Sequence, residues 1–120
     1  RLADHPAVSS VGYPTAAGSV HGHLVGPGKQ MRGGGTVMAF ELAKGYEAAR
    51  AVMSRVKLIT PAVSLGTTDT LIQHPAGVTH TSLNKEALAA GGISPGMLRL
   101  SVGIEDVEDI WADLKQAIEQ

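Results

Sequence analysis

The chain has 120 residues, enough for one domain with a single modest core, and it is 43% hydrophobic and 18% charged, a balance typical of a globular protein. A formal net charge of -1 without a basic run argues against a nucleic-acid or anionic-membrane surface, and no apolar run approaches the roughly 18 residues that span a bilayer. Cysteine is absent, which excludes a disulfide framework and a thiolate metal site and fits the cytoplasm.

Residues 1–35 are predicted to form an irregular, glycine-rich segment. They contain most of the glycines and no sustained helical period, and their apolar residues are scattered. We therefore expect this segment to pack over a core that residues 36–120 build. The first residues, RLADHPAV, are neither a signal peptide nor a natural start, because no Met opens the chain. We interpret the chain as a piece of a longer protein.

A strand and a helix are predicted next. In residues 36–42, TVMAFEL, the side chains alternate as in a half-buried strand. In residues 44–56, apolar residues recur at spacings of three and four and so share one helix face. Residues 58–63, LITPAV, are rich in β-branched side chains but include Pro61, which donates no ladder hydrogen bond. We expect an edge strand or an irregular one there.

The rest of the chain is predicted to contain a helix, a strand and a last helix. After a turn-rich connection, Asn84 can cap a short helix over residues 85–91, and residues 97–104, MLRLSVGI, alternate as a strand. Asp106 is a good N-cap for a last helix, whose apolar stripe is Val107, Ile110, Trp111, Leu114 and Ile118. The order of strands and helices predicts an α/β class domain, either α/β or α+β, built as a two-layer sandwich.

Most chemically capable residues have ordinary structural explanations. His21 and His23 form an H-x-H pair, but no third ligand stands at metal-binding spacing, so we expect solvent-exposed side chains and no metal. His74 and His80 are interpreted as loop residues that form hydrogen bonds, since no Ser-His-acid arrangement can be built from local spacing. The acids of residues 105–109, EDVED, suit the first turn of a helix.

Arg99 is harder to explain. It stands on the polar face of the strand over residues 97–104, beside Ser101 and Gly103. A guanidinium is always charged and costly to bury without a partner. It can pair with an acid on a neighbouring strand, such as Glu41, or it can hold the carboxylate of a ligand in a two-pronged grip. The strand by itself favours the structural alternative.

Several stretches, taken together, change that balance. FEL (40–42), AVSLG (62–66), SLGTTDTLIQHPAGVTH (64–80) and LRLSVGIED (98–106) with the acidic amphipathic helix resemble the C-terminal domain of the cystathionine/methionine-metabolism family of pyridoxal-phosphate enzymes. The resemblance runs from about His5 to the end. It implies a small domain of a fold type I enzyme over residues 36–120, with a mostly antiparallel sheet and helices on one face.

The resemblance also implies a set of substrate-binding residues. The arginine of RLSVG, here Arg99, binds the α-carboxylate of an amino-acid substrate. The serine of SLG, here Ser64, lines the same site, Leu65 contributes backbone, and Thr79 lies close to the pocket. Val63 stands where relatives that handle cystathionine often carry glutamate for a second ammonium group, so an apolar wall is expected.

The implied cofactor is pyridoxal 5'-phosphate, bound mainly by a preceding part of the enzyme chain. The family's Schiff-base lysine lies in an S-x-T-K context, which the chain's lysines lack: Lys29, Lys44, Lys57, Lys85 and Lys115. This chain alone is therefore expected to be inactive and to need the rest of its own enzyme chain, as part of a homotetramer. A further departure is VHGHLVGPGKQM, whose glycines and Pro27 cannot sustain the helix that relatives carry before Q-M.

Val63 favours one reaction among several. An apolar wall suits α,γ-elimination of L-methionine, which yields methanethiol, 2-oxobutanoate and ammonia. Sulfhydrylation of an O-acylhomoserine such as O-acetylhomoserine is the close alternative, because its substrates also lack a distal charge, and γ-lyase or γ-synthase reactions involving cystathionine are a third. A non-catalytic interaction module is the alternative from another class of protein.

Overall fold

The computed structural model describes residues 1–78 and 85–120. Their secondary structure, in chain order, comprises η1 (Leu2–Asp4), β1 (Val8–Gly12), η2 (Gly22–Leu24), β2 (Val37–Leu42), α1 (Tyr46–Arg55), β3 (Thr60–Pro61), β4 (Leu71–Gln73), α2 (Pro75–Val78), α3 (Lys85–Ala90), β5 (Met97–Ser101) and α4 (Val107–Glu119). No helix within the described ranges combines the length and the apolar character that a membrane crossing needs.

The strands form one five-stranded sheet in the order β1-β2-β5-β4-β3. Neighbouring strands are antiparallel except for β3, which runs parallel to β4 at the edge. The edge position of Pro61 agrees with its missing N–H, because a proline removes a donor from the ladder. The sheet is thus mostly antiparallel, as the resemblance implies.

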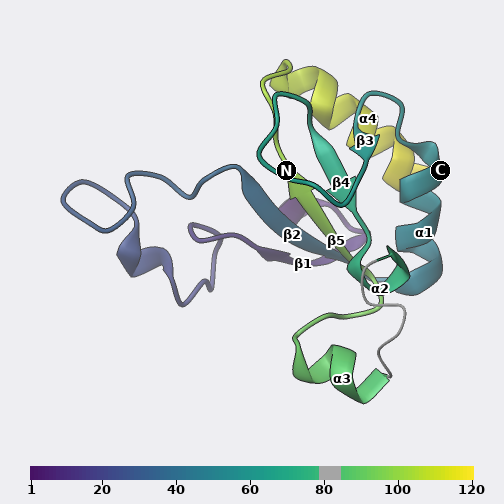
Figure 1. Ribbon diagram of the computed structural model, residues 1–120, viewed down its shortest axis with the longest axis horizontal. Helices are drawn as coiled ribbons and strands as arrows, with labels where there is room; N and C mark the ends of the chain where they lie inside the picture. The colour runs from purple at the N-terminus through teal and green to yellow at the C-terminus, as the bar shows by residue number, and fades with distance from the viewer. Residues whose placement is uncertain (79–84) are drawn as a thin grey trace.

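One face of the sheet is covered by α1 and α4 (Figure 1). Because side chains alternate along a strand, every second residue of β2, β4 and β5 points toward these helices. The resulting core is continuous from the sheet into both helices, and its buried residues are Phe40, Leu42, Ala49, Val52, Ile59, Ile72, Leu98, Leu100, Ile110, Leu114 and Ala117. This is the two-layer arrangement predicted from the order of elements.

The longest helix, α4, begins where the sequence predicts. The side chain of Asp106 accepts a hydrogen bond from the backbone N–H of Glu108 at 2.8 Å and so caps the helix. Ile110 and Leu114 of the predicted stripe are buried, but Val107 is 67% exposed. The stripe therefore contributes to the core only from the second turn onward.

A buried carboxylate joins α4 to the connection between α1 and β3. Asp113 accepts hydrogen bonds from the backbone N–H groups of Lys57, Leu58 and Ile59 at 2.8 to 3.0 Å. Burial opposes the charged form of Asp113, but these donors, together with the amide of Gln116, outweigh that effect and hold its pKa below the ordinary value. Asp113 fixes the direction in which the chain enters β3.

Two strands were not predicted. β1 lies inside the segment expected to be irregular, and β4 lies inside the connection expected to contain only turns. β1 has no regular alternation and β4 has three residues, so their hydrogen bonds to β2 and β5 define them as strands. β1 lies in residues 1–35 but pairs with β2, which lies in residues 36–120. The division of the chain into these two parts stays an interpretation.

Residues 14–36 form an arm that extends from the sheet (Figure 1). The prediction that residues 20–31, VHGHLVGPGKQM, hold no regular helix is confirmed, since their only helical turn is the short η2. At the base of the arm, Gly34 leaves room for the ring of Tyr13, and the Tyr13 hydroxyl donates a hydrogen bond to the Gly35 carbonyl at 2.8 Å.

Candidate functional site

The face of the sheet opposite α1 and α4 carries Arg99. Because Leu98 and Leu100 point into the core, Arg99 and Ser101 point the other way. Arg99 lies opposite Ala39 of β2 and Gln73 of β4 in the register of the sheet. The guanidinium is thereby carried on the central strand, between a small side chain and an amide.

The connection between β3 and β4, residues 62–70, crosses this face. Nη2 of Arg99 donates hydrogen bonds to the backbone carbonyl oxygens of Val63 at 2.9 Å and Ser64 at 2.8 Å. The Ser101 hydroxyl accepts a hydrogen bond from the backbone N–H of Gly66 at 2.9 Å. Two side chains of β5 therefore hold residues 63–66 against the sheet.

One other donor of Arg99, Nε, lacks such an acceptor in the described residues. Its Nε is buried and has no hydrogen-bond partner within residues 1–78 and 85–120. Within those residues Arg99 also takes part in no ion pair, so the alternative pairing with Glu41 is absent from them. A desolvated guanidinium donor without an acceptor is costly, and an anionic ligand group would relieve that cost.

A second set of contacts anchors the far end of the 62–70 connection. The carboxylate of Glu105 accepts from the backbone N–H of Thr70 at 2.6 Å and from its hydroxyl at 2.7 Å, and the Thr70 hydroxyl accepts from the Gly103 N–H at 2.9 Å. The hydrogen bonds from the backbone and the side chain of Thr70 lower the pKa of Glu105. Gly103 is required, because a Cβ there would collide with the Thr68 carbonyl oxygen.

Four of the five predicted site residues lie in one place. Arg99 contacts the backbone of Val63 and Ser64, and Leu65 follows directly in the chain. Val63 and Leu65 are 57% and 52% exposed, so both can contact a ligand above this face of the sheet. Thr79, the fifth, lies outside the described residues.

Sequence reasoning missed Ser101 and Glu105. The sequence pattern marks Ser101 only as a small neighbour of Arg99, and it places Glu105 in the first turn of the last helix. The structure corrects the second assignment, because Glu105 precedes the N-cap and binds Thr70. Because Arg99 and Ser101 are two residues apart, the sequence places them on the same face of the strand. Only the path of residues 62–70 shows that both side chains bind the backbone of residues 63–66.

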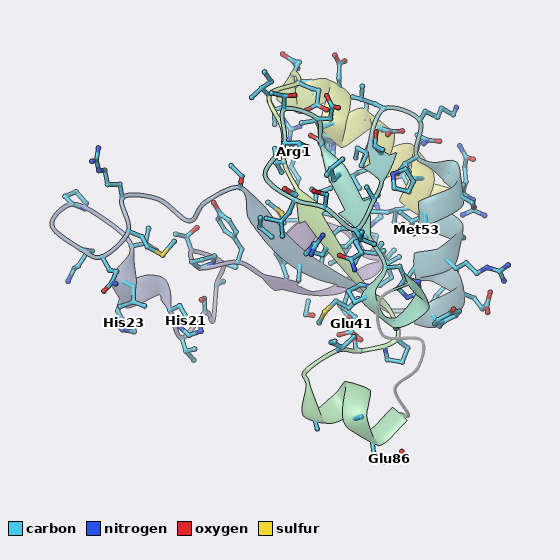
Figure 2. All side chains as sticks on the ribbon, viewed as in Figure 1. Arg1, His21, His23, Glu41, Met53 and Glu86 are labelled. Atoms are coloured by element: carbon cyan, nitrogen blue, oxygen red, sulfur yellow. The ribbon has the colours of Figure 1, made fainter. Side chains whose placement is uncertain are left out.

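The histidines that the structure describes lie outside this site. His21 and His23 are on the protruding arm, away from the sheet that carries Glu41 (Figure 2). His74 is buried, its Nε2 lies 2.8 Å from the Pro95 carbonyl oxygen, and its ring packs against Tyr46. No cluster of three or more metal-ligating side chains exists among the described residues. His80 lies outside them.

Comparison with known proteins gives consistent matches. Residues 1–119 match the family described as Cys/Met metabolism PLP-dependent enzyme. The chain is 48% identical over 120 residues to an L-methionine gamma-lyase of Fusobacterium nucleatum subsp. polymorphum, covering 99% of this chain and 30% of that protein. It is 45% identical over 118 residues to O-acetyl-L-homoserine sulfhydrylase 1 of Thermus thermophilus, covering 98% of this chain and 28% of that protein.

Solved structures agree with these matches. A protein described as an O-acetylhomoserine (thiol)-lyase from Campylobacter jejuni, which carries a pyridoxyl-lysine monophosphate, has a TM-score of 0.88 and 38% identity, covering 99% of this chain and 28% of its own. A cystathionine gamma synthase from Xanthomonas oryzae pv. oryzae has a TM-score of 0.84 and 42% identity, covering 98% and 30%. The chain thus spans about 30% of the length of the relatives that it matches.

Proposed function

The chain belongs to the Cys/Met metabolism family of PLP-dependent enzymes, and we propose that it forms the part of such an enzyme that binds the substrate's α-carboxylate. The observation that carries the proposal is the state of Arg99. Its guanidinium is held in one orientation by the carbonyl oxygens of Val63 and Ser64, while its buried Nε has no partner in the described residues. A carboxylate placed beside it would supply the missing acceptor.

Orientation is the contribution that we assign to this domain. A rigid strand carries Arg99, and the 62–70 connection limits the directions in which the guanidinium can turn. Fixing the carboxylate at one end of an amino acid determines how its Cα–H bond is presented to the reacting groups. Arg99 is therefore proposed to bind and orient the substrate rather than to transfer a proton.

Pyridoxal phosphate fits this arrangement as a neighbour of the site. When bound, the cofactor supplies an electron sink that stabilises negative charge at the carbons of an amino acid. On this face the Arg99 guanidinium is the positive group, and the carbonyl oxygens of Val63 and Ser64 already accept its hydrogen bonds. This arrangement suits an amino-acid carboxylate. We assign none of these groups to the cofactor's phosphate. We propose that the rest of the enzyme chain holds the cofactor.

We propose L-methionine as the substrate, with α,γ-elimination as the reaction. The support is the apolar, exposed side chain of Val63 beside Arg99, together with several relatives at 43–48% identity that are L-methionine gamma-lyases. Sulfhydrylation of O-acetylhomoserine is the second candidate, because a relative with that name is 45% identical to this chain. Cystathionine gamma synthase, the name of the Xanthomonas structure, is less favoured because Val63 offers no charge to a distal ammonium group.

Product analysis of the full-length enzyme with pyridoxal phosphate tests this proposal. Incubation with L-methionine alone should release methanethiol, 2-oxobutanoate and ammonia in equal amounts. Parallel incubations contain O-acetylhomoserine with sulfide, or cystathionine. Turnover of O-acetylhomoserine with sulfide but not of methionine would overturn the choice of reaction and leave the carboxylate-binding role intact.

Assembly and location stay predictions: the resemblance implies a homotetramer, and the absence of cysteine fits the cytoplasm. The mass of the full-length protein in solution, measured by light scattering, checks the oligomeric state. A mass of one or two chains would contradict the prediction.

A further inference from the structure

We propose that Ser101 is a positioning residue for the substrate's carboxylate and that it acts through the 62–70 connection. The inference rests on the proposed function of Arg99. It concerns a residue that makes no contact with the substrate in this proposal, but holds the segment that orients the guanidinium.

Ser101 is built into the sheet as a fixed anchor. It is 1% exposed and lies two residues after Arg99 on the same face of β5. Its hydroxyl accepts the backbone N–H of Gly66 at 2.9 Å. Gly66 has φ +75°, a backbone conformation that other residues rarely adopt, so the turn that presents this N–H depends on glycine.

The link from Ser101 to Arg99 runs through residues 63–66. Both hydrogen bonds from Nη2 of Arg99 go to carbonyl oxygens of this segment, and a guanidinium Nη2 has two hydrogens to give. A carboxylate must therefore approach the Nε and Nη1 side. The height of the segment above β5 sets the plane of the guanidinium, and the bond from Gly66 to Ser101 sets that height.

Removing the Ser101 hydroxyl would leave the Gly66 N–H without this acceptor. Of the two β5 side chains that hold residues 63–66, only Arg99 would then remain. Arg99 would then follow the movements of the segment. The affinity for a carboxylate should fall, because a planar, two-pronged contact depends on orientation. The affinity for the rest of the substrate should change little.

The test compares a pair of ligands that differ only in the carboxylate. L-Norleucine carries the carboxylate and has no leaving group at Cγ, and pentylamine is the same molecule without the carboxylate. Dissociation constants of both for the full-length enzyme are measured from the absorption change of bound pyridoxal phosphate. Ser101→Ala should raise the dissociation constant of norleucine about tenfold and that of pentylamine by less than about twofold. The absorption of the ligand-free enzyme should not change.

Controls separate this role from a general structural one. Ser54→Ala removes an exposed hydroxyl of α1 that donates to the Ala51 carbonyl, and it should leave both constants unchanged. Ser101→Cys keeps the side-chain shape but offers a weaker acceptor, so it should shift the norleucine-to-pentylamine ratio in the same direction by about threefold. If Ser101→Ala does not bind the cofactor, Ser101→Cys decides the question.

The outcomes also distinguish this inference from the proposed function. Arg99→Lys should shift the same ratio. If it does and neither Ser101 variant does, Arg99 binds the carboxylate and Ser101 has no positioning role. If Ser101→Ala weakens both ligands equally, the residue is only structural and the inference fails. If Arg99→Lys leaves the ratio unchanged, the assignment of the carboxylate site fails and the inference fails with it.

Discussion

A charged side chain in the middle of a strand needs acceptors for its donors, and Arg99 has only some of them in the described residues. Nη2 is satisfied by two backbone carbonyl oxygens, and Nε is buried without a partner. The sheet therefore stabilises one orientation of the guanidinium while leaving a donor unpaired. This combination is the one that the proposed binding role requires, and a structural ion pair would not leave that donor unpaired.

Replacing Arg99 by lysine keeps the charge and removes the planar fork. In the full-length enzyme we expect kcat/KM for the amino-acid substrate to fall at least about tenfold, equivalent to about 1.4 kcal/mol, because both affinity and orientation suffer. The absorption of the ligand-free holoenzyme should not change. Arg50→Lys on α1, whose side chain is 73% exposed, serves as the matched control. Full activity of Arg99→Lys would return Arg99 to a structural role.

Val63 tests substrate preference at the same scale. Val63→Glu places a carboxylate in an apolar wall, which is unfavourable unless a cation arrives to pair with it. Methionine has no distal cation, whereas cystathionine carries a distal ammonium group. The ratio of kcat/KM values should move toward cystathionine by about 1–3 kcal/mol.

Steady-state kinetics of both substrates measure this ratio. Val107→Glu introduces the same change at an exposed position of α4 and should leave the ratio unaltered. An unchanged ratio in Val63→Glu would mean that residue 63 does not face the substrate, and the preference for methionine would lose its main support.

At the scale of elements, short connections are fixed by polar side chains from distant parts of the chain. Ser101 and Glu105 anchor the 62–70 connection, and Asp113 anchors the turn between α1 and β3. Each acceptor binds backbone N–H groups that no ladder or helix satisfies. Connections of this kind hold a defined shape because buried N–H groups require acceptors.

Asp113→Asn tests the anchor between α1 and β3. Its folded-state pKa is lowered, so its stabilising effect is present above the unfolded pKa and is lost as the pH falls through the folded pKa. We expect the variant of the full-length protein to be less stable at pH 7 by about 1–3 kcal/mol, because the charge-assisted bonds from three backbone N–H groups are weakened.

Thermal unfolding across a series of acidic pH values checks this expectation. The gap between wild type and Asp113→Asn should shrink as the pH is lowered through the folded pKa of Asp113. Asp109→Asn, in the exposed first turn of α4, removes the same charge without these backbone bonds and should cost less than about 1 kcal/mol. A gap that stays constant with pH would contradict the role of the charge.

At the scale of the whole molecule, the chain carries only part of the groups that the proposed reaction needs. The described residues supply the face that we propose to bind a carboxylate, and none of the chain's lysines lies in the family's S-x-T-K context. We therefore predict that the 120-residue chain alone neither binds pyridoxal phosphate tightly nor degrades methionine. Absorption titration with the cofactor and assay of methanethiol check this. Lyase activity of the purified 120-residue chain would contradict it.

Much of the fold followed from local patterns. The alternation in β2 and at Leu98 and Leu100 of β5, the cap at Asp106 and the apolar stripe of α4 from Ile110 onward are confirmed. The predicted continuation of the strand to Ile104 is wrong, because β5 ends at Ser101 and Ile104 is 82% exposed. These features depend on neighbours within a few residues, so a single stretch contains enough information. The position of Arg99 on the polar face of its strand is information of the same kind.

The sequence by itself determined the main elements, the family resemblance and the residue that binds a carboxylate in our proposal. Only the tertiary structure decided that β1 and β4 are strands, that Glu105 holds Thr70, and that Ser101 holds Gly66 beside Arg99. These contacts join residues 26 to 35 positions apart in the sequence. Periodicity along a strand or helix does not specify which distant N–H meets which acceptor, because that depends on how the whole sheet is assembled.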